Sequence, residues 1–396
     1  MLPRVKITFL NGQLGTVPTS QDGLLLLVTG GAVVSETFAL GTPYLIYRPD
    51  GLEALGVTAE NNAGLHKMVK EFYAEADEGT PVYVMAVTPT EKMATLCDKD
   101  SGPLKAILQK MRGQIRGVVV ARNPGEESPT NTDGLDEDVF TALPKAQALA
   151  EWSVSDLYAP IFVALEGRAY KDAASLKDLS EETNNRVCIV IGDTDPESKG
   201  AAMGTFAGRV AMVPVQRNIG RVRDGQLAPL QMYLGNKPVE EVMDDVTTIY
   251  DKGYITPRVH AGKSGYYYTD DRMACEPTDD YAHLSHRRVI DKAYRIAYDT
   301  LLEYLNDEIQ VNTDGTMQAG IVKSWQASVE SAIDSQMTAL GELSADDGAA
   351  SGGCKCVIDT TQNVLATSTV KVVLKVRPYG YARFIDVELG FLVESA

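Results

Sequence analysis

Six short runs of apolar residues, separated by stretches with helical spacing, constrain the fold of this chain most strongly. The runs are rich in Val, Ile and Leu, and they cover residues 24–29, 44–47, 82–87, 117–121, 161–165 and 187–191. Apolar runs of this length with little polar alternation are typical of strands buried on both faces of a parallel sheet. The sequence therefore predicts a sheet that is covered by helices.

The stretches between these runs have the apolar spacing of helices. Residues 61–76 place Leu65, Met68 and Phe72 on one face, with polar residues elsewhere. Further helices are expected over residues 104–111, 138–152 and 197–212. Alternating strands and helices predict an α/β domain with a Rossmann-like mixed sheet and right-handed crossovers over residues 21–213.

The second half of the chain has a different texture. We expect a short amphipathic helix at residues 239–250 and a strand–turn–strand hairpin at residues 254–269. Two long helices are expected at residues 285–307 and 317–340, and two strands at residues 370–377 and 384–393. Polar residues 124–138 predict an exposed loop, and residues 345–353 a polar break. The chain is thus predicted to be α/β and α+β, in four parts: an N-terminal strand arm (1–20), the sheet domain (21–213), a C-terminal domain with two long helices (214–372) and a C-terminal strand arm (373–396).

The charge of the chain argues against direct contact with nucleic acid. It has 37 basic and 54 acidic residues and a net charge of −17, and an acidic surface repels phosphate. No apolar run is long enough to span a bilayer, and the first residues lack the features of a signal peptide. We therefore expect a cytoplasmic protein without direct membrane insertion. Five scattered cysteines suit reduced thiols in that compartment.

Two short motifs have the residue types of functional sites, and each lacks a required part. Residues 261–264 (AGKS) resemble the end of a phosphate-binding loop, but Pro257 stands where the leading glycine should be, and a strand-like run follows. These residues are predicted to form a hairpin turn. His283 and His286 are three residues apart, but no H-E-x-x-H pattern supplies further metal ligands, so we interpret them as residues at a helix start.

The remaining candidates are equally incomplete. Residues 200–208 (GAAMGTFAG) do not follow the dinucleotide fingerprint and favour close helix packing. Cys354 and Cys356 form a lone C-x-C in a predicted flexible stretch, without the second pair that structural zinc needs. The acid pair Asp270–Asp271 is interpreted as solvated turn residues. We therefore expect no catalytic residue, no cofactor, no metal site and no enzyme. The main alternative is a doubly wound α/β enzyme with an unidentified small-molecule ligand.

Three stretches, taken in order, carry a resemblance to a known family. Residues 37–87 include FALGTPYLIYRPDGLEALG, a helix and GTPVYVMAV, and residues 215–230 read VQRNIGRVRDGQLAPL. In residues 253–312 an extended GYITPRVHAGKSGYYYTDDRMA leads into SHRRVIDKAYRIAYDTLLEYLNDEIQVN. This order resembles the contractile tail sheath proteins of phages and contractile injection systems. Residues 266–272 depart from the G-x-R-T wording of that family, and its large insertions are absent, as in a minimal, divergent member.

The resemblance implies a structural role. Sheath subunits form hexameric rings that stack into a helical polymer around an inner tube protein, and the polymer contracts to drive the tube through a target envelope. Baseplate and terminator proteins are further implied partners. The implied location is the cytoplasm during assembly and then a virion tail or injection particle. Another phage structural protein, such as a baseplate protein, is a further alternative.

The resemblance also implies two sets of contact residues. In the family, terminal arms join the sheets of neighbouring subunits by strand addition, in which unpaired main-chain groups supply affinity. The arm residues of this chain would be Val5, Ile7, Phe9, Phe384, Ile385, Val387 and Leu389. We hypothesise that the cations at the start of the first long helix face the tube, namely Arg287, Arg288, Lys292 and Arg295. A solvated helix face is the alternative interpretation.

Overall fold

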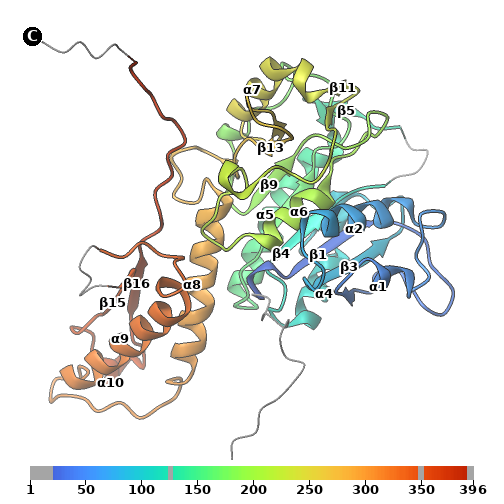
Figure 1. The fold of residues 1–396 in the computed structure, drawn as a ribbon. Coiled ribbons are helices and arrows are strands. Elements are labelled where there is room, and N and C mark those ends of the chain that lie inside the picture. The colour runs from blue at the N-terminus through green and yellow to red at the C-terminus, as the bar shows by residue number, and fades with distance from the viewer. Residues whose placement is uncertain (1–20, 124–127, 347–351, 390–396) are drawn as a thin grey trace, which may run out of the picture. The chain divides into compact units, whose positions relative to one another are not determined.

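The six predicted strands form one mixed sheet (Figure 1). The computed structural model describes residues 21–123, 128–346 and 352–389. In order across the sheet, the strands are β2 (Tyr44–Ile46), β3 (Val82–Val87), β1 (Leu25–Gly30), β4 (Gly117–Val120), β7 (Phe162–Glu166) and β9 (Val187–Val190). β2 is antiparallel to β3, and the other neighbouring pairs are parallel. β1, β4, β7 and β9 are buried at every position, which confirms the prediction of covered strands.

Two helices with glycine at their contact cover part of this sheet. α2 (Ala63–Glu75) packs on α6 (Met203–Met212), and both contact β1. Figure 1 shows the two helices in front of the sheet. A Cβ atom at Gly208 would lie 2.5 Å from the carbonyl oxygen of Phe72, and Gly204 is closer still to the carbonyl oxygen of Met68. Glycine therefore sets the approach of the two helices, as the small residues of this stretch predicted.

The other helices before residue 213 are α1 (Asp50–Glu53), α3 (Met93–Leu96), α4 (Pro103–Met111) and α5 (Glu137–Ser155). Of these, α4 and α5 were predicted, whereas the short α1 and α3 were not. The Asp138 carboxylate in the first turn of α5 accepts hydrogen bonds from the main-chain N–H groups of Met93 and Ala94, which start α3. The prediction of an exposed loop over residues 124–138 is partly wrong, because Leu135 is fully buried. It belongs to a hairpin of β5 (Asn131–Thr132) and β6 (Leu135–Asp136), while residues 124–127 lie outside the described residues.

The chain divides into two compact units, Met1–Arg287 and Arg288–Ala396. Residues after 213 still belong to the first unit, since Ile255 extends the sheet through a parallel bridge to Val190. The change in the sequence pattern after residue 213 therefore lies inside the first unit. The elements that residues 214–287 add are β10 (Tyr233–Leu234) with β11 (Lys237–Pro238), α7 (Met243–Asp251), β12 (Pro257–Arg258) with β13 (Tyr267–Tyr268), and β14 (Ala274–Cys275), which pairs with β8 (Thr183–Asn184). Residues 261–264 form the exposed turn between β12 and β13, as predicted.

The second unit combines long helices with a β-hairpin. Its elements are α8 (Leu284–Leu302), which begins in the first unit, α9 (Ala319–Ile333) with a π-helical turn (Asp334–Thr338), β15 (Cys354–Ile358), α10 (Val364–Thr367) and β16 (Val372–Val376). Trp325 of α9 shares a hydrophobic core with Ile358 of β15, and Tyr304 stacks on Trp325 at a centroid distance of 4.4 Å. The prediction of a flexible stretch at Cys354 and Cys356 is wrong, because these residues lie in β15.

Smaller features complete the fold. Single turns of 3-10 helix occur at η1 (Gln21–Gly23), η2 (Leu179–Glu181), η3 (Val222–Asp224) and η4 (Val239–Glu241). The five cysteines are free thiols, and all except Cys354 are buried. Every helix in the described ranges is too short or too polar to cross a membrane.

The contact between α2 and α6 makes a test of the fold. Gly204→Ala should lower the free energy of unfolding by about 3 kcal/mol, because the added methyl group overpacks the helix contact. Gly320→Ala in α9 is the matched control, since a Cβ atom there meets nothing within 4 Å and alanine favours a helix. Urea unfolding followed by circular dichroism measures both variants. An unchanged unfolding curve for Gly204→Ala would contradict the close approach.

Candidate functional site

The described part of the predicted C-terminal arm is exposed and forms no strand. Residues 378–389 lack regular secondary structure. The exposed fractions of its apolar side chains are 79% for Phe384, 75% for Ile385, 77% for Val387 and 96% for Leu389. Residues 384–389, the described part of the strand predicted over residues 384–393, thus form no strand, because a strand needs a hydrogen-bonded neighbour. The N-terminal arm residues Val5, Ile7 and Phe9 lie outside the described residues.

The β15–β16 hairpin has one covered face and a free outer edge on β16. Its two strands are antiparallel, with Cys356 opposite Leu374 and Val357 opposite Val373. Cys356 is buried, whereas Val357 is 48% exposed on the other face. Among the residues that the structure describes, neither strand pairs with a third one. The outer main-chain groups of β16 are therefore available to a further strand, whereas on β15 the N–H of Cys356 already donates a hydrogen bond to the Glu330 carboxylate.

The cations predicted to face a tube lie in the first turns of α8. Their exposed fractions are 7% for Arg287, 5% for Arg288 and 8% for Lys292, while Arg295 is partly exposed. The Lys292 ammonium is 2.6 Å from the Glu342 carboxylate, and the Arg287 guanidinium lies over the ring of Tyr281. Of the four, Arg295 is thus the most accessible to a partner in this conformation. Their role toward a tube stays a prediction.

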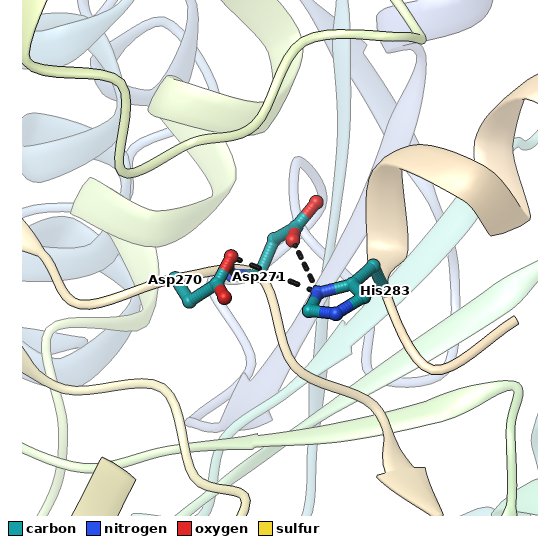
Figure 2. Close-up of side chains that lie close together, drawn as sticks. All are labelled: Asp270, Asp271 and His283. Atoms are coloured by element: carbon teal, nitrogen blue, oxygen red, sulfur yellow. Dashed lines mark hydrogen bonds and ion pairs between the residues drawn. The ribbon is translucent and has the colours of Figure 1, made fainter. Parts of the chain in front are cut away.

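Asp270, Asp271 and His283 gather where α8 begins (Figure 2). The Nδ1 atom of His283 is 3.0 Å from Oδ1 of Asp271 and 3.7 Å from Oδ1 of Asp270. The Asn218 side-chain amide donates hydrogen bonds to both carboxylates. Oδ2 of Asp271 accepts a hydrogen bond of 2.7 Å from the main-chain N–H of Ser285. Asp271 therefore caps the first turn of α8 from a distant segment.

This carboxylate is charged in a buried place. Burial opposes ionisation of Asp271, but the hydrogen bond and charge of His283, with hydrogen bonds from Asp270 and Ser285, hold its pKa well below the ordinary value. The three side chains could supply three metal ligands, and within the described ranges no other group of His, Cys, Asp and Glu does so. Their oxygens already accept hydrogen bonds from Asn218 and Ser285, so an ion would have to displace these donors. The arrangement favours a structural cap.

Sequence reasoning misjudged two of the three residues in this cluster. Asp270 and Asp271 were interpreted as solvated turn residues, which is wrong, since they are 4% and 0% exposed. The interpretation of His283 as a residue at a helix start is confirmed. The run of three tyrosines just before the acid pair was the available signal for its burial. The contact with Asn218 could not be predicted from a local pattern, because Asn218 lies 52 residues before Asp270.

A cavity of about 520 Å³ lies at the carboxyl ends of the parallel strands. Its lining includes Thr29, Arg122, Glu166 and Asp193, which end or follow β1, β4, β7 and β9. The strand order reverses at β1, and α/β enzymes bind their ligands at such a place. This cavity is therefore where the enzyme alternative would locate its site.

Internal carboxylates occupy the helix end at this cavity. Glu166 accepts hydrogen bonds from the main-chain N–H groups of Ala201, at 3.1 Å, and Arg122, at 2.8 Å. Glu71 is hydrogen-bonded to the main chain of Gly204. The start of α6 thus has anionic partners where a helix end would bind a phosphate. Burial raises the pKa of Glu71 and of Glu166 to about 7.

Family models match both parts of the chain. The N-terminal domain of DUF2586 matches residues 2–272, and the C-terminal domain of DUF2586 matches residues 280–396. The chain belongs to the DUF2586 family. No curated protein matches this DUF2586 chain.

Solved structures similar to this DUF2586 protein belong to contractile machines. The contracted helical sheath of the anti-feeding prophage (AFP) has a TM-score of 0.60 and 15% identity, over 98% of this chain and 99% of that chain. A chain of the AFP baseplate has a TM-score of 0.60 and 15% identity, over 99% of both chains. A sheath tail protein from Listeria innocua has a TM-score of 0.51 and 10% identity, over 85% of this chain and 89% of that chain. The resemblance to sheath proteins is thus confirmed at the level of the fold.

The helix cap makes a pH-dependent prediction. Asp271→Asn should lower the free energy of unfolding by about 3 kcal/mol at neutral pH, because it replaces a buried carboxylate whose oxygens accept hydrogen bonds from Asn218 and Ser285. A lowered pKa contributes stability above the unfolded value and loses it as the pH falls, so the difference from wild type should shrink below about pH 4. Asp280→Asn, at an exposed neighbouring position, is the control. Denaturant curves across pH test this, and a difference independent of pH would refute it.

The buried glutamates Glu71 and Glu166 predict the opposite pH dependence, in which the free energy of unfolding falls as the pH rises. Because the pKa of Glu71 is raised, its contribution to stability is fully present below the unfolded pKa and is lost as the pH rises through 7. Glu71→Gln should remove up to about 3 kcal/mol of the fall in stability between about pH 5 and 9. Glu53→Gln, an exposed change in α1, should leave that fall intact. Thermal melts at a series of pH values measure the slope, and equal slopes for Glu71→Gln and wild type would exclude this account.

Proposed function

We propose that this DUF2586 protein is a structural subunit of a contractile sheath, which polymerises around an inner tube and contracts to drive the tube through a target envelope. The observation that carries the proposal is the segment 384–389, which exposes apolar side chains at alternating positions. A protein that acts alone would not be expected to leave Leu389 96% exposed beside Val387 and Ile385. The fold shared with the AFP sheath chain over almost its full length supports the proposal.

Strand addition is the proposed link between subunits. The free edge of β16 offers main-chain hydrogen bonds, and the segment 384–389 has no such bonds within its own chain's sheets. A contact between two different surfaces of successive copies does not close on itself, so it generates a helix or stacked rings. We propose hexameric rings from the resemblance, with the N-terminal arm (1–20) and the C-terminal arm (373–396) as the linking segments. The Rossmann-like sheet domain (21–213) and the helical domain (214–372) form the body of the proposed subunit.

The proposed partners are further copies of this chain, an inner tube protein, and baseplate and terminator proteins. We propose assembly in the cytoplasm, followed by residence in a virion tail or an injection particle. For the tube contact we retain Arg295 as the first candidate, because Arg287, Arg288 and Lys292 reach a partner only if the start of α8 opens.

We propose that the protein is not an enzyme, and that contraction draws on energy stored in the assembled lattice, through bistable interfaces. The placement of Glu166 and Glu71 at the start of α6 supports this over the α/β enzyme alternative, since both carboxyl groups already bind main-chain N–H groups that a phosphate would need.

Electron microscopy of the purified chain at high concentration tests the proposal. We expect hollow, ridged cylinders from the full chain, and their loss when residues 1–15 or 378–396 are removed. Val387→Asp should also abolish cylinders, because it places a charge in the proposed strand. Leu230→Asp is the matched control, since Leu230 is 90% exposed but lies outside the arms. Single particles of monomer size under all conditions, with or without a tube protein, would reject the sheath function.

A further inference from the structure

The outer face of the β15–β16 hairpin is basic in an acidic protein. Side chains along both strands alternate between covered and exposed positions. Main-chain hydrogen bonds of Asp359 with Lys371 and of Arg377 with Gly353 extend the ladder beyond the strand ends. The exposed face therefore carries Lys355, Lys371, Lys375 and Arg377. These cations stand out because the chain has a net charge of −17.

This face contains charges that repel one another. Lys355 and Lys375 are directly opposite in the register, and like charges at opposed positions destabilise a sheet. Lys355 has a counter-charge in Glu330, whose carboxylate lies 3.1 Å from its ammonium. The structure gives Lys371 and Lys375 no ion pair within the described residues, so a further acidic group would stabilise this side of β16.

The exposed segment 384–389 supplies acids with matching spacing. In an extended chain, successive side chains point to opposite faces. Asp386 and Glu388 then share one face with Phe384, and the apolar side chains Ile385, Val387 and Leu389 share the other. The first face suits the lysines and the exposed Val373 of β16, which is 52% exposed. The second face suits the partly covered side of β16 formed by Val372, Leu374 and Val376.

We propose that residues 384–389 of a second copy of this chain add as a strand to the free edge of β16. The added strand has a single facing, in which Asp386 and Glu388 lie on the same side of the sheet as Lys371 and Lys375. A slip by one residue would place both acids beside Val372 and Leu374 and is excluded by its desolvation cost. The occupant is a second copy, because the chain's own segment leaves β16 unpaired even though only residues 377–383 separate them. This inference rests on the proposed sheath function and specifies how its subunits recognise one another.

Charge reversal on each side tests the facing. The double variants Lys371→Glu/Lys375→Glu and Asp386→Lys/Glu388→Lys should each lower the sedimenting, cylinder-forming fraction of the full chain by about tenfold or more. Combining the four changes should restore assembly to within about threefold of wild type, because opposite charges face each other again. The control Lys263→Glu/Lys323→Glu makes the same change of net charge at exposed positions outside this face. Circular dichroism melts of the monomers confirm that each variant is folded.

A peptide assay separates this inference from the sheath function itself. A fluorescent peptide of residues 383–389 should bind the full chain, more weakly at high salt, and binding should fall by about tenfold in Lys371→Glu/Lys375→Glu. Peptide binding without cylinders would reject the sheath and uphold the facing. Cylinders that tolerate both reversals, or a combined variant without rescue, would overturn the facing and leave the sheath proposal standing. Pairing of the segment with its own β16, seen as no peptide binding and protection of residues 384–389 from hydrogen exchange at all protein concentrations, would also overturn it.

Discussion

The main-chain contact between α2 and α6 is the constraint on which the first unit depends. At Gly204 and Gly208 the two helices approach so closely that no side chain fits between them. This approach fixes the start of α6 at the carboxyl edge of the sheet, where Glu166 and Glu71 meet its N–H groups. Two acids of raised pKa therefore stand at the start of α6, at the edge of the sheet where α/β folds of this kind can bind a phosphate.

A second buried charge, the carboxylate of Asp271, secures the start of α8. Asp271 ties the segment after β13 to the first turn of α8, while His283 and Asn218 balance its charge and lone pairs. The free energy that keeps this helix start in place comes from a few polar contacts, whose strength depends on pH.

The sequence predicted those parts of the fold that local patterns determine. The six sheet strands were foreseen because burial on both faces requires a run of apolar residues. The helices α2, α4 and α5 were foreseen because burial of one stripe requires apolar residues at helical spacing. β15 was missed, since Lys355 and the neighbouring glycines hide a short strand whose burial depends on α9. The cap by Asp271 was missed because its partner Asn218 is remote in the chain. A strand at residues 384–389 needs a hydrogen-bonded neighbour, and these residues have none in the described structure, so the sequence pattern alone could not settle this element.

The free edge of β16 also has a consequence for how the chain exists before it assembles. A hairpin of two strands with one helix behind it is close to the lower limit of independent stability. If each added strand completes a neighbour's sheet, the second unit reaches its full stability only when the chain is assembled with other copies. Its melting temperature then depends on protein concentration by mass action. The second unit of a free chain then unfolds easily, whereas contacts between assembled chains stabilise it against unfolding. Growth of the polymer is then also the last step in the folding of each member.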